Sequence, residues 1–273
     1  MKKNLSLSVC FTGKFVKNRN VLIVLFLFIA SFYSSTAYAQ TLRILSYNIH
    51  HGCDTSEKLQ LQNMADLIRK SNVDIVGLEE VDSVCKRSEN TDQAKILGKL
   101  TGMHYVFVRH FAFEGGSYGL ALLSKYPISD LENNRLPVLT QENGNTRAFL
   151  TATLHVPHHK KILVGVAHLD YRDDSSRVHQ SAIILNMFKD KKMPVLLLGD
   201  LNAAPESKAV LRLKELFTDA NRTDYKTFPA GHPREKIDYI LVNKDHYLKT
   251  IDEPFYDVLF SDHFPIGATI EIK

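Results

Sequence analysis

Residues 195–202 read Val-Leu-Leu-Leu-Gly-Asp-Leu-Asn, an apolar run that ends in Gly199-Asp200 and Asn202. A continuous apolar run of this length is typical of a β-strand covered on both faces, because a half-exposed strand alternates apolar and polar residues. We therefore predict a buried strand that delivers a carboxylate and an amide to one edge of its sheet.

Three other apolar runs end in the same way. They are residues 42–47 before Asn48, residues 73–78 before Glu79 and Glu80, and residues 161–167 before His168. A single polar residue after a strand is common, because loops usually follow strands. Four together predict a shared edge where polar groups converge on a ligand, as in open α/β sheets.

Strand-length runs and amphipathic stretches alternate along the rest of the chain. Further strands are expected at residues 105–108, 120–123, 149–154, 237–242 and 265–272. Helices are expected at residues 56–70, 92–100 and 175–188. The first is expected to have Thr55 or Ser56 as its N-cap, and the third Asp173, Asp174 or Ser175. This mixture predicts the α/β class.

The first 39 residues differ from the rest of the chain. A basic stretch without acidic residues precedes an apolar run at residues 21–32, and Ala37-Tyr38-Ala39 follows. This order is typical of a secretory signal, so we expect cleavage near Ala39-Gln40, export to the periplasm or the medium, and a catalytic domain at residues 40–273 with no membrane span. A retained N-terminal anchor is the alternative, although the apolar run is short for a bilayer.

The charge of the chain depends on this segment. It carries five of the 34 Lys and Arg residues and none of the 30 Asp and Glu residues, so 29 basic residues face 30 acidic ones after cleavage, a formal charge of −1. No block of like charges remains after cleavage, so the sequence shows no long basic stretch that would bind duplex DNA. We therefore expect no stable nucleic-acid partner, and we expect the mature domain to be a monomer.

Two cysteines, Cys53 and Cys85, remain after cleavage. Each follows closely on a strand at the predicted edge, so a disulfide could form between them in an oxidising compartment. Two free thiols are the equally open alternative.

The polar strand ends, together with later motifs, resemble the endonuclease/exonuclease/phosphatase superfamily. Seven matching segments follow in the family's order: LSYNIHHG at 45–52, DIVGLEEV at 74–81, YGLALLS at 118–124, AHLD at 167–170, GDLN at 199–202, IDY at 237–239 and SDHFP at 261–265. Each motif is weak alone, but seven in order are specific. The resemblance implies a four-layer α/β sandwich like that of deoxyribonuclease I, with two mixed β-sheets packed face to face, helices outside and the site at one end.

The resemblance also implies a metal site. Glu80 and Asp262 are expected to ligate the metal, and Asn48 is expected to hold the metal or a phosphate oxygen. This oxygen-rich set suits Mg²⁺ or Mn²⁺, and the His and Cys spacing of a structural zinc site is absent. Glu79, at a position where relatives often have Gln, is expected to lie beside the site without binding the ion.

The catalytic residues implied in the same way are His263, Asp238, Asp200, His168 and Asn202. His263 should face the scissile phosphate, while Asp238 fixes its tautomer and raises its pKa. Two roles stay open for His263 at this point, a base and an imidazolium that stabilises charge. Asp200 should orient or deprotonate the attacking water beside Asn202. His168 is expected to bind phosphate or protonate the leaving group, and Arg147 to contact phosphate.

These assignments predict an exported, metal-dependent hydrolase that cleaves a small or lipid-linked phosphate ester with activated water in a single step. A secreted nuclease is the alternative, and the absence of Trp and of interleaved aromatic and basic residues argues against it. A non-catalytic binding module on the same fold would be expected to lose Glu80, Asp200 or His263.

Other polar residues carry weaker expectations. His50 and His51 should point to opposite faces of an extended, substrate-side loop. Lys86-Arg87-Ser88 could meet substrate phosphate or form a solvated loop, and Tyr118 could line the site. The substrate is expected to be chosen by loops at residues 85–91, 110–118, 133–145 and 229–236.

Overall fold

The protein is described by a computed structural model that covers residues 39–140, 146–157, 160–221, 223 and 225–273. The predicted signal lies outside these ranges except for Ala39. Within the described ranges, no helix combines the length and the apolar character needed to cross a membrane.

Two mixed β-sheets of six strands each form the described part of the chain. The strands of the first sheet, in the order in which they lie side by side, are β11 (Tyr247–Asp252), β12 (Ile266–Ile272), β1 (Gln40–Asn48), β2 (Ile75–Ser83), β4 (Gly116–Ser124) and β3 (His104–Phe113). Those of the second sheet are β5 (Ile128–Pro137), β6 (Thr146–Val156), β7 (Lys160–His168), β8 (Val195–Asp200), β10 (Asp238–Asn243) and β9 (Phe217–Asp219). Only the central pairs, β1 with β2 and β7 with β8, are parallel among these strands.

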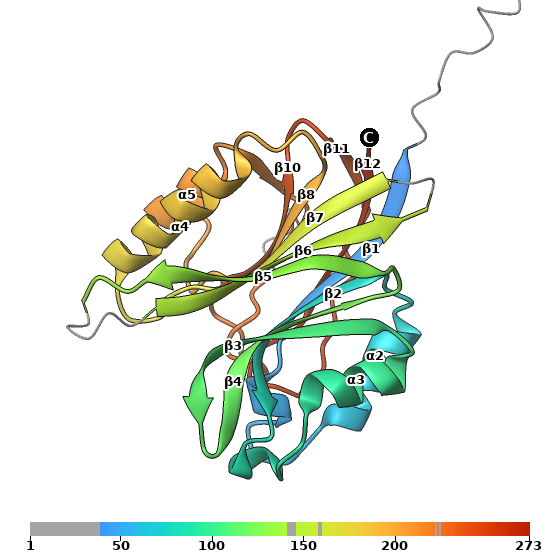
Figure 1. Ribbon diagram of the computed structural model, residues 1–273, viewed down its shortest axis with the longest axis vertical. Helices are drawn as coiled ribbons and strands as arrows, with labels where there is room; N and C mark the ends of the chain where they lie inside the picture. Colours follow the sequence, from blue (N-terminus) through green and yellow to red (C-terminus); the bar gives the residue numbers. More distant parts are fainter. Residues whose placement is uncertain (1–38, 141–145, 158–159, 222, 224) are drawn as a thin grey trace, which may run out of the picture. The chain divides into compact units, whose positions relative to one another are not determined.

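Helices cover the outer faces of both sheets. They are α2 (Leu61–Lys70), α3 (Gln93–Thr101), α4 (Asp174–Phe188) and α5 (Lys208–Leu213). Figure 1 shows α2 and α3 on one side and α4 and α5 on the other, with the two sheets between them. One apolar cluster joins α2 and α3 to the first sheet, and another joins α4 and α5 to the second. The predicted four-layer sandwich is confirmed.

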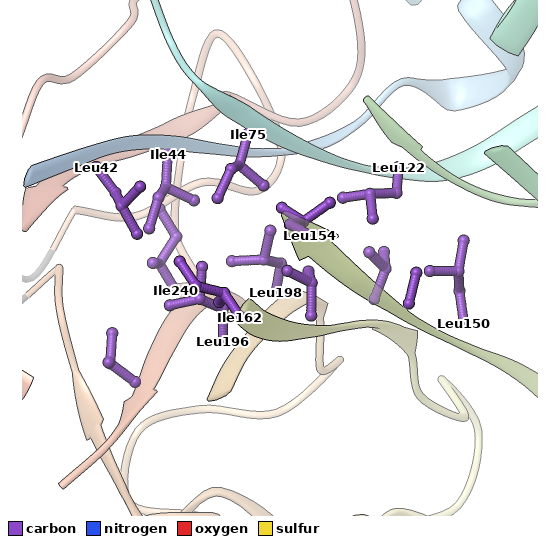
Figure 2. Close-up of a cluster of buried hydrophobic side chains, with 14 of the residues drawn as sticks. Leu42, Ile44, Ile75, Leu122, Leu150, Leu154, Ile162, Leu196, Leu198 and Ile240 are labelled. Carbon is purple, nitrogen blue, oxygen red and sulfur yellow. The ribbon is translucent and has the colours of Figure 1, made fainter. Parts of the chain in front are cut away.

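A third apolar cluster fills the space between the sheets. Figure 2 shows Leu42, Ile44 and Ile75 of the first sheet facing side chains of the second, including Leu198 and Ile240. These side chains are at most 1% exposed. The sheets approach closely at Gly77, where an added Cβ would lie 2.9 Å from the Leu198 Cβ. A dry core of this kind holds the two sheet edges in fixed relation.

The first helix begins later than expected. It starts at Leu61 after Gln60, which provides no side-chain cap, so the predicted capping by Thr55 or Ser56 is wrong. The reason is a turn in which the Asp54 carboxylate accepts hydrogen bonds from the backbone N–H groups of Ser56 and Lys58. The third helix agrees with expectation, since the Asp173 side chain accepts from the Ser176 N–H.

Several strands were not expected from the sequence. β5 and β11 are mostly exposed, and β9 has only three residues, so none has the apolar run used to recognise a strand. Strands β3 and β4 also occupy most of residues 110–118, which were expected to form a loop. Edge strands are hard to recognise from the sequence because only part of each one packs on the core.

Both remaining cysteines are buried free thiols. Cys85 Sγ lies 3.2 Å from the Phe113 carbonyl oxygen. Burial raises the pKa of both thiols to about 11. Of the two alternatives left open by the sequence, the structure contains the free thiols.

Candidate active site

The register of the strands explains why polar side chains meet at one edge. In the first sheet the parallel pair places Asn48 beside Glu79. In the second sheet the parallel pair places His168 beside Asp200, and the antiparallel strand β10 starts with Asp238 opposite Asp200. The carboxyl ends of parallel strands share one sheet edge, so both central pairs deliver their polar residues to the site.

Gly199 allows the backbone conformation that this edge requires. Its φ is +140°, and a Cβ at this position would lie 1.9 Å from the Ala167 carbonyl oxygen. Because no other residue fits this backbone and this close approach, glycine is required immediately before Asp200.

His263 and Asp238 form a buried pair. His263 Nδ1 lies 3.0 Å from Asp238 Oδ2, which also accepts a hydrogen bond from Thr227 Oγ1. Burial alone would lower the pKa of His263, but the negative charges of Asp238, Asp200 and Asp262 outweigh it and raise the pKa to about 10. His263 is therefore an imidazolium at neutral pH, oriented by its carboxylate partner.

Asp200 lies at the centre of the group. Its Oδ1 accepts from the Asn202 backbone N–H at 2.8 Å, and its Oδ2 accepts from Asn48 Nδ2 at 3.1 Å. The same Oδ2 lies 3.6 Å from His168 Nε2 and 3.8 Å from His263 Nε2. Burial and the charge of Asp238 raise the pKa of Asp200. A carboxylate of this kind suits proton transfer near neutral pH.

Asn48 connects the two predicted metal carboxylates. Its Nδ2 donates to Glu80 Oε1 at 3.2 Å, and its backbone carbonyl accepts from Ser261 Oγ, next to Asp262, at 2.7 Å. Its side-chain oxygen accepts the His50 backbone N–H at 3.1 Å, so the amide N–H is the group that faces the site. That orientation suits an anionic phosphate oxygen.

The backbone around the site is strained. Glu80 lies at an irregularity in the pairing of β2 with β4 and has a φ of 58°. Asn202, His50 and His51 have φ values of 48°, 45° and 44°. Left-handed conformations are costly for residues with a Cβ, and their gathering at one place is typical of a functional site.

Glu79 lies behind the site, as expected. It is fully buried, and neither carboxyl oxygen has a hydrogen-bond partner among the described residues. Burial and the charges of Asp238 and Asp200 raise its pKa well above the usual range. A neutral Glu79 adds no further negative charge beside these two carboxylates.

His168 and Arg147 form the other side of the site. Arg147 is 8% exposed and pairs with Asp170 at 3.3 Å. Burial above all, together with the positive charge of Arg147, lowers the pKa of His168 far below the usual range. His168 Nδ1 is buried without a partner among the described residues. His168 is thus a neutral ring beside a guanidinium.

The donors at this edge fit a hard divalent cation. Glu80 and Asp262 are only half-buried, so their carboxylates are open to a ligand. Asp200, Asp238 and His263 also bring potential ligand atoms within 4.8 Å of one another. The Nδ1 contact with Asp238 occupies that side of the His263 ring, which suits an orienting pair better than a metal site.

The prediction for His50 and His51 is wrong. They lie in a 3₁₀ turn with left-handed backbone, so their rings are only 4.3 Å apart instead of on opposite faces. His51 Nε2 lies 2.9 Å from the exposed Glu57 carboxylate.

Other contributors were not singled out from the sequence. Thr227 Oγ1 donates a hydrogen bond to Asp238, and Ser261 Oγ accepts one from the His263 backbone N–H. Arg135 and Arg172 line a pocket beside Glu80. Arg87 and Tyr118, which the sequence left open between site and surface, line the same pocket. Single hydroxyls and arginines have no sequence spacing that marks them, so only the fold identifies them.

Comparisons with known proteins agree with this geometry. The model of the Endonuclease/Exonuclease/phosphatase family matches residues 45–263. The chain belongs to this family. Members of the endonuclease/exonuclease/phosphatase family hydrolyse phosphate esters and typically depend on divalent metals.

Family relatives align over nearly the whole described chain. Uncharacterized protein YbhP of Escherichia coli K12 is 28% identical over 248 residues, covering 84% of this chain and 96% of YbhP. A Beutenbergia cavernae endonuclease/exonuclease/phosphatase structure matches with a TM-score of 0.71 and 21% identity, covering 85% of this chain and 72% of that one. Mannosyl-6-phosphatase Bt3783 of Bacteroides thetaiotaomicron matches with a TM-score of 0.67 and 16% identity, covering 84% and 99%. The structural likeness shows a shared fold.

Proposed function

We propose that this protein is an exported hydrolase that uses Mg²⁺ or Mn²⁺ to cleave a phosphate ester of a small or lipid-linked compound. The observation that carries the proposal is the position of His263, whose Nδ1 is 3.0 Å from Asp238 while its Nε2 faces Asn48 at 3.5 Å. An oriented imidazolium at an edge that also carries Glu80 is suited to an anionic ester. The likeness to a mannosyl-6-phosphatase supports a small substrate.

Glu80 and Asp262 would hold the cation, which when bound neutralises negative charge on the phosphate. Asn48 would donate from Nδ2 to a phosphate oxygen, because its side-chain oxygen already accepts the His50 backbone N–H. His263 would donate a hydrogen bond from Nε2 to a phosphate oxygen, because its raised pKa keeps the ring protonated. We therefore assign His263 to charge stabilisation rather than to proton abstraction.

Asp200 would take the proton of the attacking water. The Asn202 N–H donates to Oδ1, and Oδ2 accepts one hydrogen bond from Asn48 Nδ2, so Oδ2 keeps a second lone pair to receive the proton. The water oxygen forms a bond to phosphorus, the ester P–O bond breaks, and the leaving oxygen takes up a proton from solvent. The proton on Asp200 returns to solvent before the next turnover. His168, held neutral, would contribute a ring N–H to the phosphate or the leaving oxygen, with Arg147 beside it.

The direct test is hydrolysis by the purified mature protein after dialysis against EDTA. We expect background rates without metal and restored hydrolysis of bis-p-nitrophenyl phosphate or p-nitrophenyl phosphate with Mg²⁺ or Mn²⁺. Plasmid DNA at physiological salt should remain intact, and nicking would favour the nuclease alternative. No turnover of any of these compounds would favour a binding module.

Export is tested separately by cell fractionation and N-terminal sequencing. Protein from the periplasm or medium should begin at Gln40, and retention of residues 1–39 in a membrane fraction would contradict the proposal. Size-exclusion chromatography is expected to give a monomer.

A further inference from the structure

A pocket of about 680 Å³ lies beside the predicted metal ligand Glu80. This volume is in the range of small-molecule sites. Four arginines line it, namely Arg87, Arg135, Arg147 and Arg172. We call this cavity the arginine pocket. The hydrolytic reaction itself needs cationic groups only at the phosphate that is cleaved, so four guanidinium groups call for a further explanation.

The arginine pocket is lined by fewer negative charges than positive ones. Glu80 and Asp170 are the carboxylates in its lining, and Glu80 is assigned to the metal. Asp170 pairs with Arg147, and buried Asp82 pairs with Arg87 through two contacts of 2.8 and 2.9 Å. These arginines are thus neutralised by partners of their own.

Arg135 and Arg172 have no carboxylate partner among the described residues. Arg135 donates to the backbone oxygens of Arg109, His110 and Thr146 and to the Thr146 hydroxyl. Arg172 donates from Nε to Tyr171, which leaves its terminal nitrogens open. Both arginines are exposed to solvent, so a ligand can reach them. Their two charges remain available for an anion.

Neighbouring histidines respond to this positive charge. His110 lines the arginine pocket, and burial together with Arg147 and Arg135 lowers its pKa to about 3. Arg147 also contributes to the lowered pKa of His168. Burial is the larger cause at both histidines, and the charges of Arg135 and Arg172, which no carboxylate among the described residues neutralises, give the pocket a positive potential that attracts anionic ligands.

Aromatic rings hold the arginines and add flat surfaces. The Arg87 guanidinium lies 4.6 Å from the Phe113 ring centre. Tyr171 lies between Arg147 and Arg172, with its ring centre 5.3 and 4.9 Å from their guanidinium carbons. Tyr171 is 56% exposed, so part of its side chain is accessible to a ligand. Flat and cationic groups together suit a ring compound that carries an anion.

We propose that the arginine pocket binds a second phosphate of the substrate, so the preferred substrates are bisphosphates on one ring-sized scaffold. This inference rests on the proposed function. The phosphate beside His263 is hydrolysed, and the second phosphate, held by Arg172 and Arg135, remains unchanged in the product.

The test compares substrates that differ by one phosphate. Adenosine 3′,5′-bisphosphate is assayed against the 3′- and 5′-monophosphates, and fructose 1,6-bisphosphate against the 1- and 6-monophosphates, with Mg²⁺ or Mn²⁺. At least one bisphosphate should exceed its monophosphates in kcat/KM by tenfold or more, with the difference mainly in KM. The scaffold that shows the preference distinguishes nucleotide from sugar substrates.

Arg172→Gln should bring the ratio of bisphosphate to monophosphate kcat/KM close to one. Arg172→Lys, which retains the charge, should keep part of the preference, and Arg69→Gln on the outer helix α2 should keep all of it. Among the described residues, the hydrogen bond and the ring contact of the Arg172 side chain are both with exposed Tyr171, so the fold should survive both changes.

The outcomes separate the two proposals. Turnover of bis-p-nitrophenyl phosphate without preference for any bisphosphate would overturn the inference and leave the proposed function intact. If no compound is hydrolysed, the proposed function fails, and calorimetry with adenosine 3′,5′-bisphosphate and with pyrophosphate tests the pocket alone. Binding weakened at least tenfold by Arg172→Gln would support the inference, and no binding, or binding unaffected by the change, would overturn it.

Discussion

The acidic floor of the site, formed by Asp200, Asp238 and His263, and the arginine pocket beside it hold charge in different ways. The floor residues are at most 4% exposed, and the charges they carry face one another at 3.0 to 3.8 Å. In the arginine pocket, by contrast, Arg135 and Arg172 are exposed and lack carboxylate partners among the described residues.

Burial is the physical origin of the difference. In the floor, low water access makes each charge shift the pKa of its neighbours, so the groups are poised for proton transfer before a substrate arrives. At the exposed arginines, water screens the positive charge, and a ligand can displace that water. Changes in the floor should therefore act mainly on kcat, and changes in the arginine pocket mainly on KM.

The largest effect should follow from breaking the floor. His263→Ala should lower kcat roughly 10²–10⁴-fold, since the cationic donor is lost. Asp238→Asn should also lower kcat and should move the alkaline limb of the pH–rate profile to lower pH, because loss of the carboxylate lowers the His263 pKa. Steady-state kinetics on the tested p-nitrophenyl ester measures both effects, with the exposed His179→Ala on α4 as control. Near-normal rates in both floor variants would contradict the assignment.

A smaller effect should follow at Arg147, which lines the arginine pocket and contributes to the lowered pKa of His168 in the active site. Arg147→Gln removes a charge-assisted contact worth about 1.5–3 kcal/mol, so kcat/KM should fall roughly 10–100-fold. The same kinetics tests this, and Arg212→Gln on the outer helix α5 should match the unchanged protein. An effect on stability alone, with normal kcat/KM, would make Arg147 a structural residue.

The smallest effect concerns stability and tests the burial of His110 in the lining of the arginine pocket. The pKa of His110 is about 3 in the folded protein, below the 6.5 of a free histidine. Its contribution to stability is therefore fully present above pH 6.5 and is lost as pH falls, by about 1.4 kcal/mol per pH unit. Between pH 7.5 and 5.0 the protein should lose about 2 kcal/mol more than the His110→Phe variant.

Urea denaturation at the two pH values measures this difference. His104→Phe, an exposed position on the same strand, should follow the unchanged protein. Parallel pH dependence of the His110→Phe variant and the unchanged protein would show that no proton uptake by His110 accompanies unfolding.

Much of the active-site edge could be predicted from sequence because four of its polar residues come at the ends of buried strands. Asn48, Glu80, His168 and Asp200 each follow an apolar run, and local periodicity is enough to find them. His263 and Asp238 needed the order of family motifs, since 25 positions separate them and no local pattern pairs them. Their placement in one group agrees with the expectation, while their catalytic roles stay predictions.

The arginine pocket could not be predicted in this way. Arg135 lies on β5, a polar edge strand with no apolar run, and Arg172 lies in the segment before α4. Neither arginine has a motif or a spacing that marks it in the sequence. Their convergence depends on how β5 lies against β6 and how the segments after β7 and β2 reach the same cavity.

The sequence by itself determined the α/β class, the buried strands and the polar groups at their ends, because these follow from local hydrophobic periodicity and backbone chemistry. Only the tertiary structure decided which of those ends face one another, which charges are neutralised by partners, and which remain for a ligand. The physical reason is that pKa shifts and charge compensation depend on burial and on distances of a few ångströms between residues far apart in the chain.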